Sequence, residues 1–471
     1  MFGLSIELTL ILFFCLIAAC AFEFINGFHD TANAVANVIY TKTLKPAYAV
    51  MWSGLFNFLG VMLGGISVAM GIMKLLPTSV LVDQNVYHSL ALILALIFTA
   101  IIWNLGTWYI GLPCSSSHTL IGSIFGVGIA YMLLPDVGAV ALNWTKVKDA
   151  GLSLLISPVI GFGLALGLYF LLKKVTKKNQ VLFEHDEKRK HPPVWVRALL
   201  IFTCTSVSFA HGSNDGQKGV GLVMIILIAF LPARFILNPH LETASISSKI
   251  EVIQAVLVSA DTAKLSDDNK IKLTGILAKT NKVEAISLKT KNGHSPTIND
   301  KYEIRRDLGF IQTETKDLMK ITVEQPQVYS NKQVAVVSTE LEALKKYTEY
   351  APYWVILMIS VSLGLGTMIG WKRIVVTIGE KIGKTPLTYA QGVSADLVTA
   401  STIAMASNFG LPVSTTHVLS SGVAGTMVAR NGLKNLRKKT IRNILTAWLI
   451  TLPVTIVLSA GLFLLLRWIF S

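Results

Sequence analysis

The sequence is organised around residues 26–34, which read NGFHDTANA and follow an apolar run at residues 8–22. A related segment, AHGSNDGQKG, occupies residues 210–219. Aligning Asp30 with Asp215 also aligns Gly27 with Gly212. A carboxylate within apolar membrane sequence is costly and usually marks an ion or substrate pathway. Its occurrence twice indicates a duplicated functional element.

The composition is that of a membrane protein. The 471 residues are 52% hydrophobic and 15% charged, whereas soluble domains carry about 25% charged residues. The mean hydropathy is +0.57. Apolar runs recur along the chain, and each has the length of about 20 residues that a membrane-spanning helix needs. We therefore predict an all-α polytopic membrane protein with about 10–12 transmembrane helices.

Several other classes of protein are not supported. Residues 4–25 lack a basic leader and a cleavage site, so we expect a retained membrane helix there. The four cysteines have no metal-ligand spacing, which argues against zinc and disulfides. No H-E-x-x-H motif occurs, and the phosphate-loop-like residues 379–385 have three intervening residues instead of four. We predict that the chain is not an enzyme and needs no cofactor.

The positive charge is concentrated in two short segments. Residues 173–197 hold eight Lys/Arg and three acids, and residues 430–442 hold six Lys/Arg and no acid. Short basic loops of membrane proteins face the cytoplasm. There is no soluble basic domain with interleaved aromatic residues, so nucleic-acid binding is not expected.

Composition divides the chain into five parts. They are a first transmembrane repeat (1–172), a basic cytoplasmic linker (173–193), the start of a second transmembrane repeat (194–232), a polar extramembrane insert (233–350) and the remainder of the second repeat (351–471). The insert is either a small helical domain or a partly disordered loop, and its sidedness stays open.

A second element is also duplicated. Residues 112–118 read LPCSSSH, and residues 411–417 read LPVSTTH. Two different motifs thus occur twice in the same order, which is typical of transporters built from two inverted repeats around a shared site.

The proline and hydroxyl residues of this element predict an anion site. Proline breaks an apolar helix, and Ser or Thr then caps the next one. The free N–H groups and positive dipole end of that helix attract an anion. We expect the two hydroxyl clusters to wrap a tetrahedral oxyanion: Ser115, Ser116, Ser117, Ser414, Thr415 and Thr416. The alternative is that these hydroxyls only join helices together.

The carboxylates Asp30 and Asp215 are expected to carry a coupling cation. An anion that enters against a negative-inside potential needs accompanying positive charge. Asn33, Asn214 and carbonyl groups freed by glycine-disrupted helix would assist. The alternative role of each Asp is to cap a broken helix.

Further candidates are weaker. Glu23 and Asp396 could join the cation path, while Lys218 could meet the anion or neutralise Asp215. Four histidines are candidates for a proton relay, although hydrogen bonding across helices is an equally good role for them: His29, His118, His211 and His417.

At these motifs the chain resembles the inorganic phosphate transporter (PiT) family. The family element Gly-x-Asn-Asp-x-x-Asn-Ala is similar to residues 27–34 and, less strictly, to residues 212–219. Its Pro-x-Ser-x-x-His element is similar to residues 113–118 and 412–417. The particular residues of these motifs, FHDTANAVA at 28–36 and HGSNDGQKG at 211–219, are similar to those of low-affinity Pit-type carriers of Gram-negative bacteria. The insert at 233–350 is not accounted for by this resemblance.

The resemblance implies phosphate import across the bacterial cytoplasmic (inner) membrane by a multi-pass, inverted-repeat protein. In the bacterial branch it implies proton symport of a neutral complex between a divalent metal and hydrogen phosphate, whereas other branches use Na⁺. Two departures favour protons, namely His29 in place of Asn and Lys218 at the position that corresponds to Asn33. The rival functions are a sulfate carrier and a passive anion channel. Besides phosphate and the lipid bilayer, a homodimer partner is left open.

Overall fold

The computed structural model describes residues 4–81, 86–134, 144–176, 180–183, 191–261, 264–324 and 328–470. The chain forms two compact units, one of Met1–Ile226 with Ala351–Ser471 and the other of Leu227–Tyr350. The second unit begins inside a helix, slightly before the predicted insert at 233–350.

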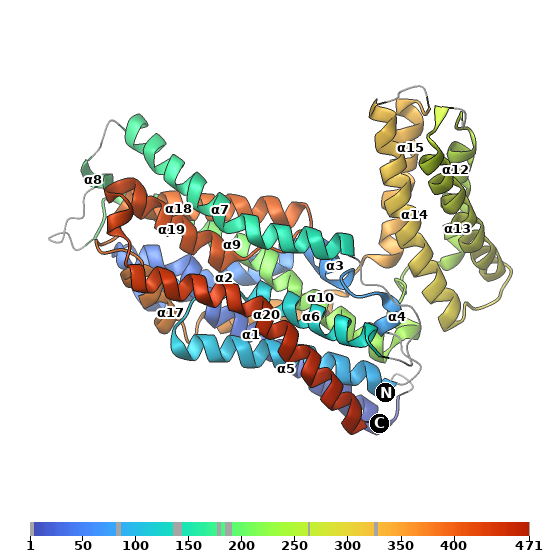
Figure 1. Ribbon diagram of the computed structural model, residues 1–471, viewed down its shortest axis with the longest axis horizontal. Helices are drawn as coiled ribbons and strands as arrows, with labels where there is room; N and C mark the ends of the chain where they lie inside the picture. Colours follow the sequence, from blue (N-terminus) through green and yellow to red (C-terminus); the bar gives the residue numbers. More distant parts are fainter. Residues whose placement is uncertain are drawn as a thin grey trace. The chain divides into compact units, whose positions relative to one another are not determined.

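The first unit is built from helices (Figure 1). Its N-terminal part contains α1 (Ile6–Tyr40), α2 (Pro46–Leu63), α3 (Ser67–Met73), α4 (Thr78–Leu81), α5 (Val86–Ile110), α6 (Ser116–Met132), α7 (Trp144–Val175), α8 (Gln180–Phe183), α9 (Val194–His211), the π-helical turn η1 (Gly212–Gly216) and α10 (Gln217–Phe230). After the second unit follow α16 (Tyr353–Thr367), α17 (Lys372–Val376), η4 (Thr377–Lys381), α18 (Tyr389–Asn408), α19 (Thr415–Asn431), η5 (Leu433–Asn435) and α20 (Lys438–Phe470). The predicted all-α membrane class is confirmed.

Fewer helices meet the length and hydropathy of a full span than the predicted 10–12. Within the described residues six do: Ile6–Tyr40, Pro46–Leu63, Tyr87–Ile110, Val147–Val175, Val194–Phe230 and Lys438–Phe470. The helices α6 and α19 have only 17 residues each because proline-containing loops precede them. Apolar runs in the sequence therefore include short helices as well as full spans.

One expected break is absent. We predicted that glycine would disrupt the helix at the first motif, but α1 runs without interruption through Gly27 and Asp30. A Cβ atom at Gly27 would meet the backbone of α16 at Leu363 O (2.5 Å) and Thr367 N (2.8 Å). This glycine therefore permits close packing of two helices. The equivalent Gly212 lies against the backbone of α2 at Asn57.

Helices from the two sequence halves pack against one another throughout this unit. Helix α1 packs on α16, α2 on α9, α7 on α19, and α20 on α5 and α6. The outer faces carry exposed apolar side chains, such as Leu155 on α7 and Val457 on α20. The interior holds buried polar residues. This is the pattern of a membrane protein with a polar site between its helices. The inverted relation of the halves stays a prediction.

The second unit contains α11 (Pro232–Phe235), the 3₁₀ turn η2 (Thr243–Ser245), α12 (Ile246–Val258), α13 (Asp267–Lys291), α14 (Ile298–Glu324) and α15 (Asn331–Thr348). Helices α12 to α15 lie side by side (Figure 1). Buried Asp307 pairs with Lys279 (3.2 Å) and Arg306 (2.9 Å). Burial lowers the pKa of Arg305 to about 10, and its guanidinium donates to Ile236 O (2.6 Å). Of the two predicted alternatives, the described residues form a helical domain.

Candidate functional site

The two proline loops start helices α6 and α19 in the same way. Gly111 and Gly410, just after α5 and α18, have φ of 76° and 66°, a left-handed conformation that suits glycine. Ser115 then caps α6 by accepting the His118 N–H (3.1 Å), and Ser414 caps α19 by accepting the His417 N–H (3.1 Å). The first turns of both helices are buried, and Thr415 lies in that of α19.

These helix starts meet at Asp30. Ser116 Oγ donates to Asp30 Oδ2 (2.9 Å) and lies 3.4 Å from Asp215 Oδ2. From the other start, Thr416 Oγ1 donates to Asp30 Oδ1 (2.5 Å). Four segments that are far apart in the sequence, namely α1, η1, α6 and α19, thus converge on one buried centre. This agrees with the shared site expected where two different motifs each occur twice in the same order.

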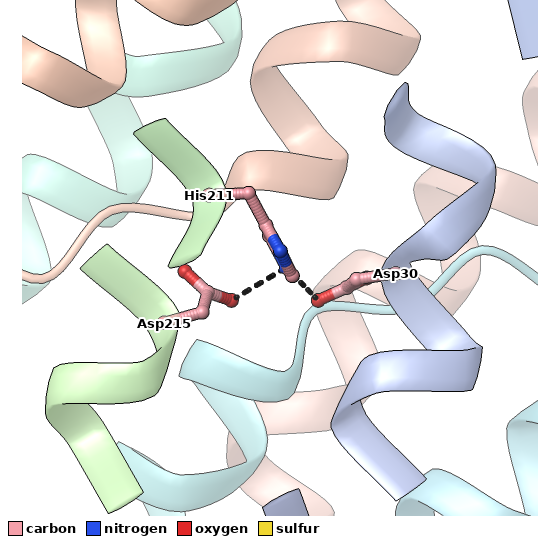
Figure 2. A group of neighbouring side chains, drawn as sticks. All are labelled: Asp30, His211 and Asp215. Carbon is pink, nitrogen blue, oxygen red and sulfur yellow. Dashed lines mark ion pairs between the residues drawn. The ribbon is translucent and has the colours of Figure 1, made fainter. Parts of the chain in front are cut away.

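His211 lies between the two carboxylates (Figure 2). Its Nε2 is 3.7 Å from Asp30 Oδ2 and 3.6 Å from Asp215 Oδ2, while Nδ1 pairs with Asn57 Oδ1 (3.0 Å). One ligand atom from each of Asp30, His211 and Asp215 lies within 4.8 Å of the others. Carboxylate and imidazole groups are common ligands of divalent metals. These three residues can therefore converge on an ion. Our expectation that no metal site is formed by protein ligands alone stays a prediction.

Lys218 is bound to the second carboxylate. Its Nζ lies 2.6 Å from Asp215 Oδ1, donates to Val413 O (3.2 Å) and also donates to Ser117 Oγ. Ser117 Oγ in turn donates to Val413 O (2.7 Å). The ammonium therefore neutralises Asp215 and ties η1 and α10 to the loop before α19.

The remaining candidate histidines surround this centre. His29 Nε2 lies 3.3 Å from Thr107 Oγ1, and its Nδ1 is 3.5 Å from Asp30 Oδ1. His118 and His417 face each other with ring centroids 4.4 Å apart, and His417 stacks on Trp448 at 3.9 Å. His118 Nδ1 also pairs with Ser115 Oγ (2.8 Å). The two rings thus join the starts of α6 and α19.

Two further predicted residues, Asn214 and Glu23, form hydrogen bonds to other partners. The Asn214 amide donates to Ser407 Oγ (3.0 Å) and Leu411 O (3.3 Å), so it supports the loop before α19. Glu23 Oε2 accepts from Asn26 (3.2 Å), while its Oε1 is buried and has no hydrogen bond to a described residue. The side chain of Asn33 lies outside the described residues.

Asp396 forms a separate buried cluster with residues of α1 and α9. It accepts hydrogen bonds from the Asn37 amide and from Thr203 Oγ1 (3.0 Å). The structure supplies partners from both halves of the chain.

Positioning residues were missed by the sequence analysis. Thr31 Oγ1 donates to Thr367 O (2.9 Å), which fastens α1 to α16 next to Asp30. Asn57 donates to Thr367 Oγ1 (2.9 Å) while it holds His211. The only available signal was a polar residue within an apolar helix, and many such residues have no role at a site.

The comparisons agree with the resemblance at the motifs. The phosphate transporter family matches residues 26–459. The low-affinity inorganic phosphate transporter PitA of Escherichia coli K12 is 41% identical over 493 residues, covering 98% of this chain and 97% of that protein. A low-affinity inorganic phosphate transporter of Buchnera aphidicola (from Acyrthosiphon pisum) is 40% identical, with 97% and 96% covered. A probable one from Bacillus subtilis is 29% identical, with 98% of each covered.

A solved structure supports the fold. It is described as the sodium-dependent phosphate transporter, is 20% identical, and covers 98% of this chain and 99% of its own with a TM-score of 0.53. The named relatives are transporters, in agreement with the prediction that the chain is not an enzyme. Their bacterial origin and the apolar helices agree with a multi-pass protein of the bacterial cytoplasmic membrane. The chain therefore belongs to the phosphate transporter family.

Proposed function

We propose that this protein imports inorganic phosphate as a neutral complex of hydrogen phosphate with a divalent metal, driven by proton symport. The observation that carries the proposal is the convergence of both carboxylates and both hydroxyl-bearing helix starts on one buried centre. Membership of the phosphate transporter family supports the choice of anion.

The phosphate oxygens bind between the helix starts in this proposal. Ser116 and Thr416 are placed to exchange their bonds with Asp30 for bonds with phosphate. Ser115 and Ser414 keep the helix starts in position through their caps. Thr415, Ser117 and Lys218 complete the polar lining, with Asn33 and Asn214 as further expected contacts. Backbone N–H groups at the helix starts add favourable partial charge.

The metal enters as part of the substrate. Asp30, His211 and Asp215 offer it three ligand atoms. Two carboxylates would repel a bare phosphate dianion at short distance, and the repulsion is strong in a medium of low dielectric constant. A divalent metal ion between the carboxylates and the phosphate attracts both and so offsets this repulsion. The neutral complex thus explains why acids lie beside an anion site, which a passive anion channel or a sulfate carrier does not.

Protons couple transport through the same carboxylates. Asp30 and Asp215 take up and release the coupling proton, and His29, His211, His118 and His417 relay it. Glu23 and the separate Asp396 cluster are further positions for the coupling cation. The two repeats move about the central site so that it opens to one side at a time.

Transport into proteoliposomes tests the proposal, with pH, Na⁺ and Mg²⁺ varied separately. We expect accumulation of labelled phosphate to require an inward proton gradient and to fall when Mg²⁺ is chelated. Phosphate accumulation that depends on a Na⁺ gradient and not on pH would show that the coupling ion is Na⁺ and not the proton. Strong competition by sulfate, or accumulation that persists after both gradients are collapsed, would contradict the proposal.

A further inference from the structure

A basic and aromatic hollow lies away from the central site, at the end of α5 and the start of α17. Its volume is about 630 Å³. Its walls are formed mainly by Trp108, Tyr109, Trp371, Lys372, Arg373 and Lys381. No acidic residue is among the described residues that line it. The hollow therefore combines three cationic side chains with three large aromatic ones.

The hollow is connected to the segment expected at the cytoplasmic face. Just after Lys381, Gly383 forms an isolated β-bridge with Leu436. The Lys384 N–H donates to Asn435 O (2.8 Å), and Arg437 Nε donates to Gly383 O (3.0 Å). Asn435 to Arg437 belong to the basic segment 430–442, which the charge rule places in the cytoplasm. The cytoplasmic leaflet is where anionic lipids attract basic groups.

The aromatic side chains hold one cation at the rim of the hollow. The Arg373 guanidinium carbon is 4.9 Å from the ring centroid of Trp108 and 4.9 Å from that of Tyr109. Its Nη1 donates to Tyr109 O (2.5 Å). Trp and Tyr are enriched where a helix leaves the hydrocarbon for the headgroup region. Lys372 and Lys381 are exposed beside this arrangement.

We propose that this hollow binds the headgroup of an anionic phospholipid. The lipid phosphate lies between Lys372 and Lys381, next to the fixed guanidinium of Arg373. The acyl chains continue along exposed apolar side chains, Ile110 (71% exposed) and Ile369 (56% exposed). Free inorganic phosphate shares the headgroup charge but gains nothing from these apolar side chains, so the lipid is the occupant that fits the whole surface.

The same contacts link the hollow to the transport centre. Trp108 Nε1 donates to Gly370 O (2.9 Å), and its ring lies 4.9 Å from that of Phe28, two residues before Asp30 in the sequence. Thr377 Oγ1 donates to Gly111 O (2.9 Å) in the loop that leads to α6. A bound lipid would thus stabilise both the α1 contact and this loop. Only this regulatory effect depends on the proposed transport function; lipid binding does not.

Lipid binding by the purified full-length protein in neutral detergent tests the proposal. The probes are phosphatidylglycerol, phosphatidylcholine and inorganic phosphate. The readouts are lipid adducts in native mass spectrometry and the shift in melting temperature. We expect phosphatidylglycerol to give a saturable adduct and a higher melting temperature. In Lys372→Gln/Lys381→Gln its apparent affinity should fall by about tenfold or more, since each basic group near an anionic lipid contributes substantially to binding.

Matched variants identify the site. Lys173→Gln/Lys174→Gln removes the same charge from the end of α7, another segment expected at the cytoplasmic face, and should bind as the wild type does. Lys372→Arg/Lys381→Arg should retain binding. Equal phosphatidylglycerol binding by the wild type and the Lys372/Lys381 glutamine variant would overturn the proposal. Stabilisation by inorganic phosphate that depends on these two lysines would also overturn it. If the wild type binds phosphatidylglycerol but takes up no phosphate in proteoliposomes, the proposed transport function is contradicted and the lipid site is not.

Discussion

Replacing Lys218 by methionine separates the structural role of this residue from its role in transport. Lys218 Nζ is 2.6 Å from Asp215 Oδ1, and both side chains are almost fully buried, with 1% and 0% exposed. Lys218→Met leaves the carboxylate without its cation. Breaking a buried ion pair from one side costs about 3–5 kcal/mol. We expect a loss of this order, with some added cost from the bonds to Ser117 and Val413 O.

The double variant Asp215→Asn/Lys218→Met is the matched control. It removes both charges, so we expect most of the lost stability to return. Unfolding of the detergent-purified variants, followed by tryptophan fluorescence in denaturant, would measure the difference. Wild-type stability of Lys218→Met would refute the reasoning, because it would show that Lys218 does not compensate a buried charge. The double variant should still fail to concentrate phosphate. Full uptake by it would remove the pair from the mechanism.

Four further changes test the packing and the site. Gly27→Ala should destabilise the protein by about 2 kcal/mol or more in the same unfolding assay, because the new methyl group meets the α16 backbone; unchanged stability would contradict the close packing. Ser116→Ala should raise the phosphate concentration that gives half-maximal uptake by about tenfold, the value of one hydrogen bond to a charged group. The control Ser123→Ala loses only a bond to Thr119 O within α6 and should leave this concentration unchanged. Asp30→Asn should abolish concentrative uptake in proteoliposomes while the protein inserts normally; accumulation at the wild-type level would exclude this carboxylate. His211→Gln should raise the Mg²⁺ concentration that uptake requires by about tenfold if a metal ligand is lost, and an unchanged Mg²⁺ dependence would exclude its contact with the metal.

Much of the site could be predicted because its residues are charged, polar or helix-breaking and lie within otherwise apolar sequence. Asp30 and Asp215 are acids in apolar sequence, and the proline–hydroxyl segments interrupt apolar helices. Such features are visible without knowing where the helices lie, since burying a charge or breaking a helix has a cost wherever it occurs. Their duplication then indicated which segments should meet. Whether each residue binds phosphate or a proton stays a prediction.

Local sequence was a poorer guide to the role of glycine and amide residues. Gly27 was expected to break α1, but the helix continues and the glycine allows α16 to approach. Asn214 was expected at the ion site, which stays a prediction, and its amide also holds the loop before α19, a role that the sequence did not indicate. A glycine can interrupt a helix or allow a second helix to approach closely. A side-chain amide can bind an ion or a backbone carbonyl. The neighbouring segment decides between these roles.

The sequence by itself determined that this is a duplicated, all-helical membrane protein with two acidic and two hydroxyl-rich motifs, because hydropathy and helix-breaking are properties of short segments. Tertiary structure alone decided that Ser116 and Thr416 meet at Asp30 and that Lys218 donates to Val413 O in the loop before α19. It also decided that Asp396 forms a separate cluster with Asn37 and Thr203. The physical reason is that hydrogen bonds and ion pairs act over about 3 Å, and only helix packing brings such distant segments of the chain that close.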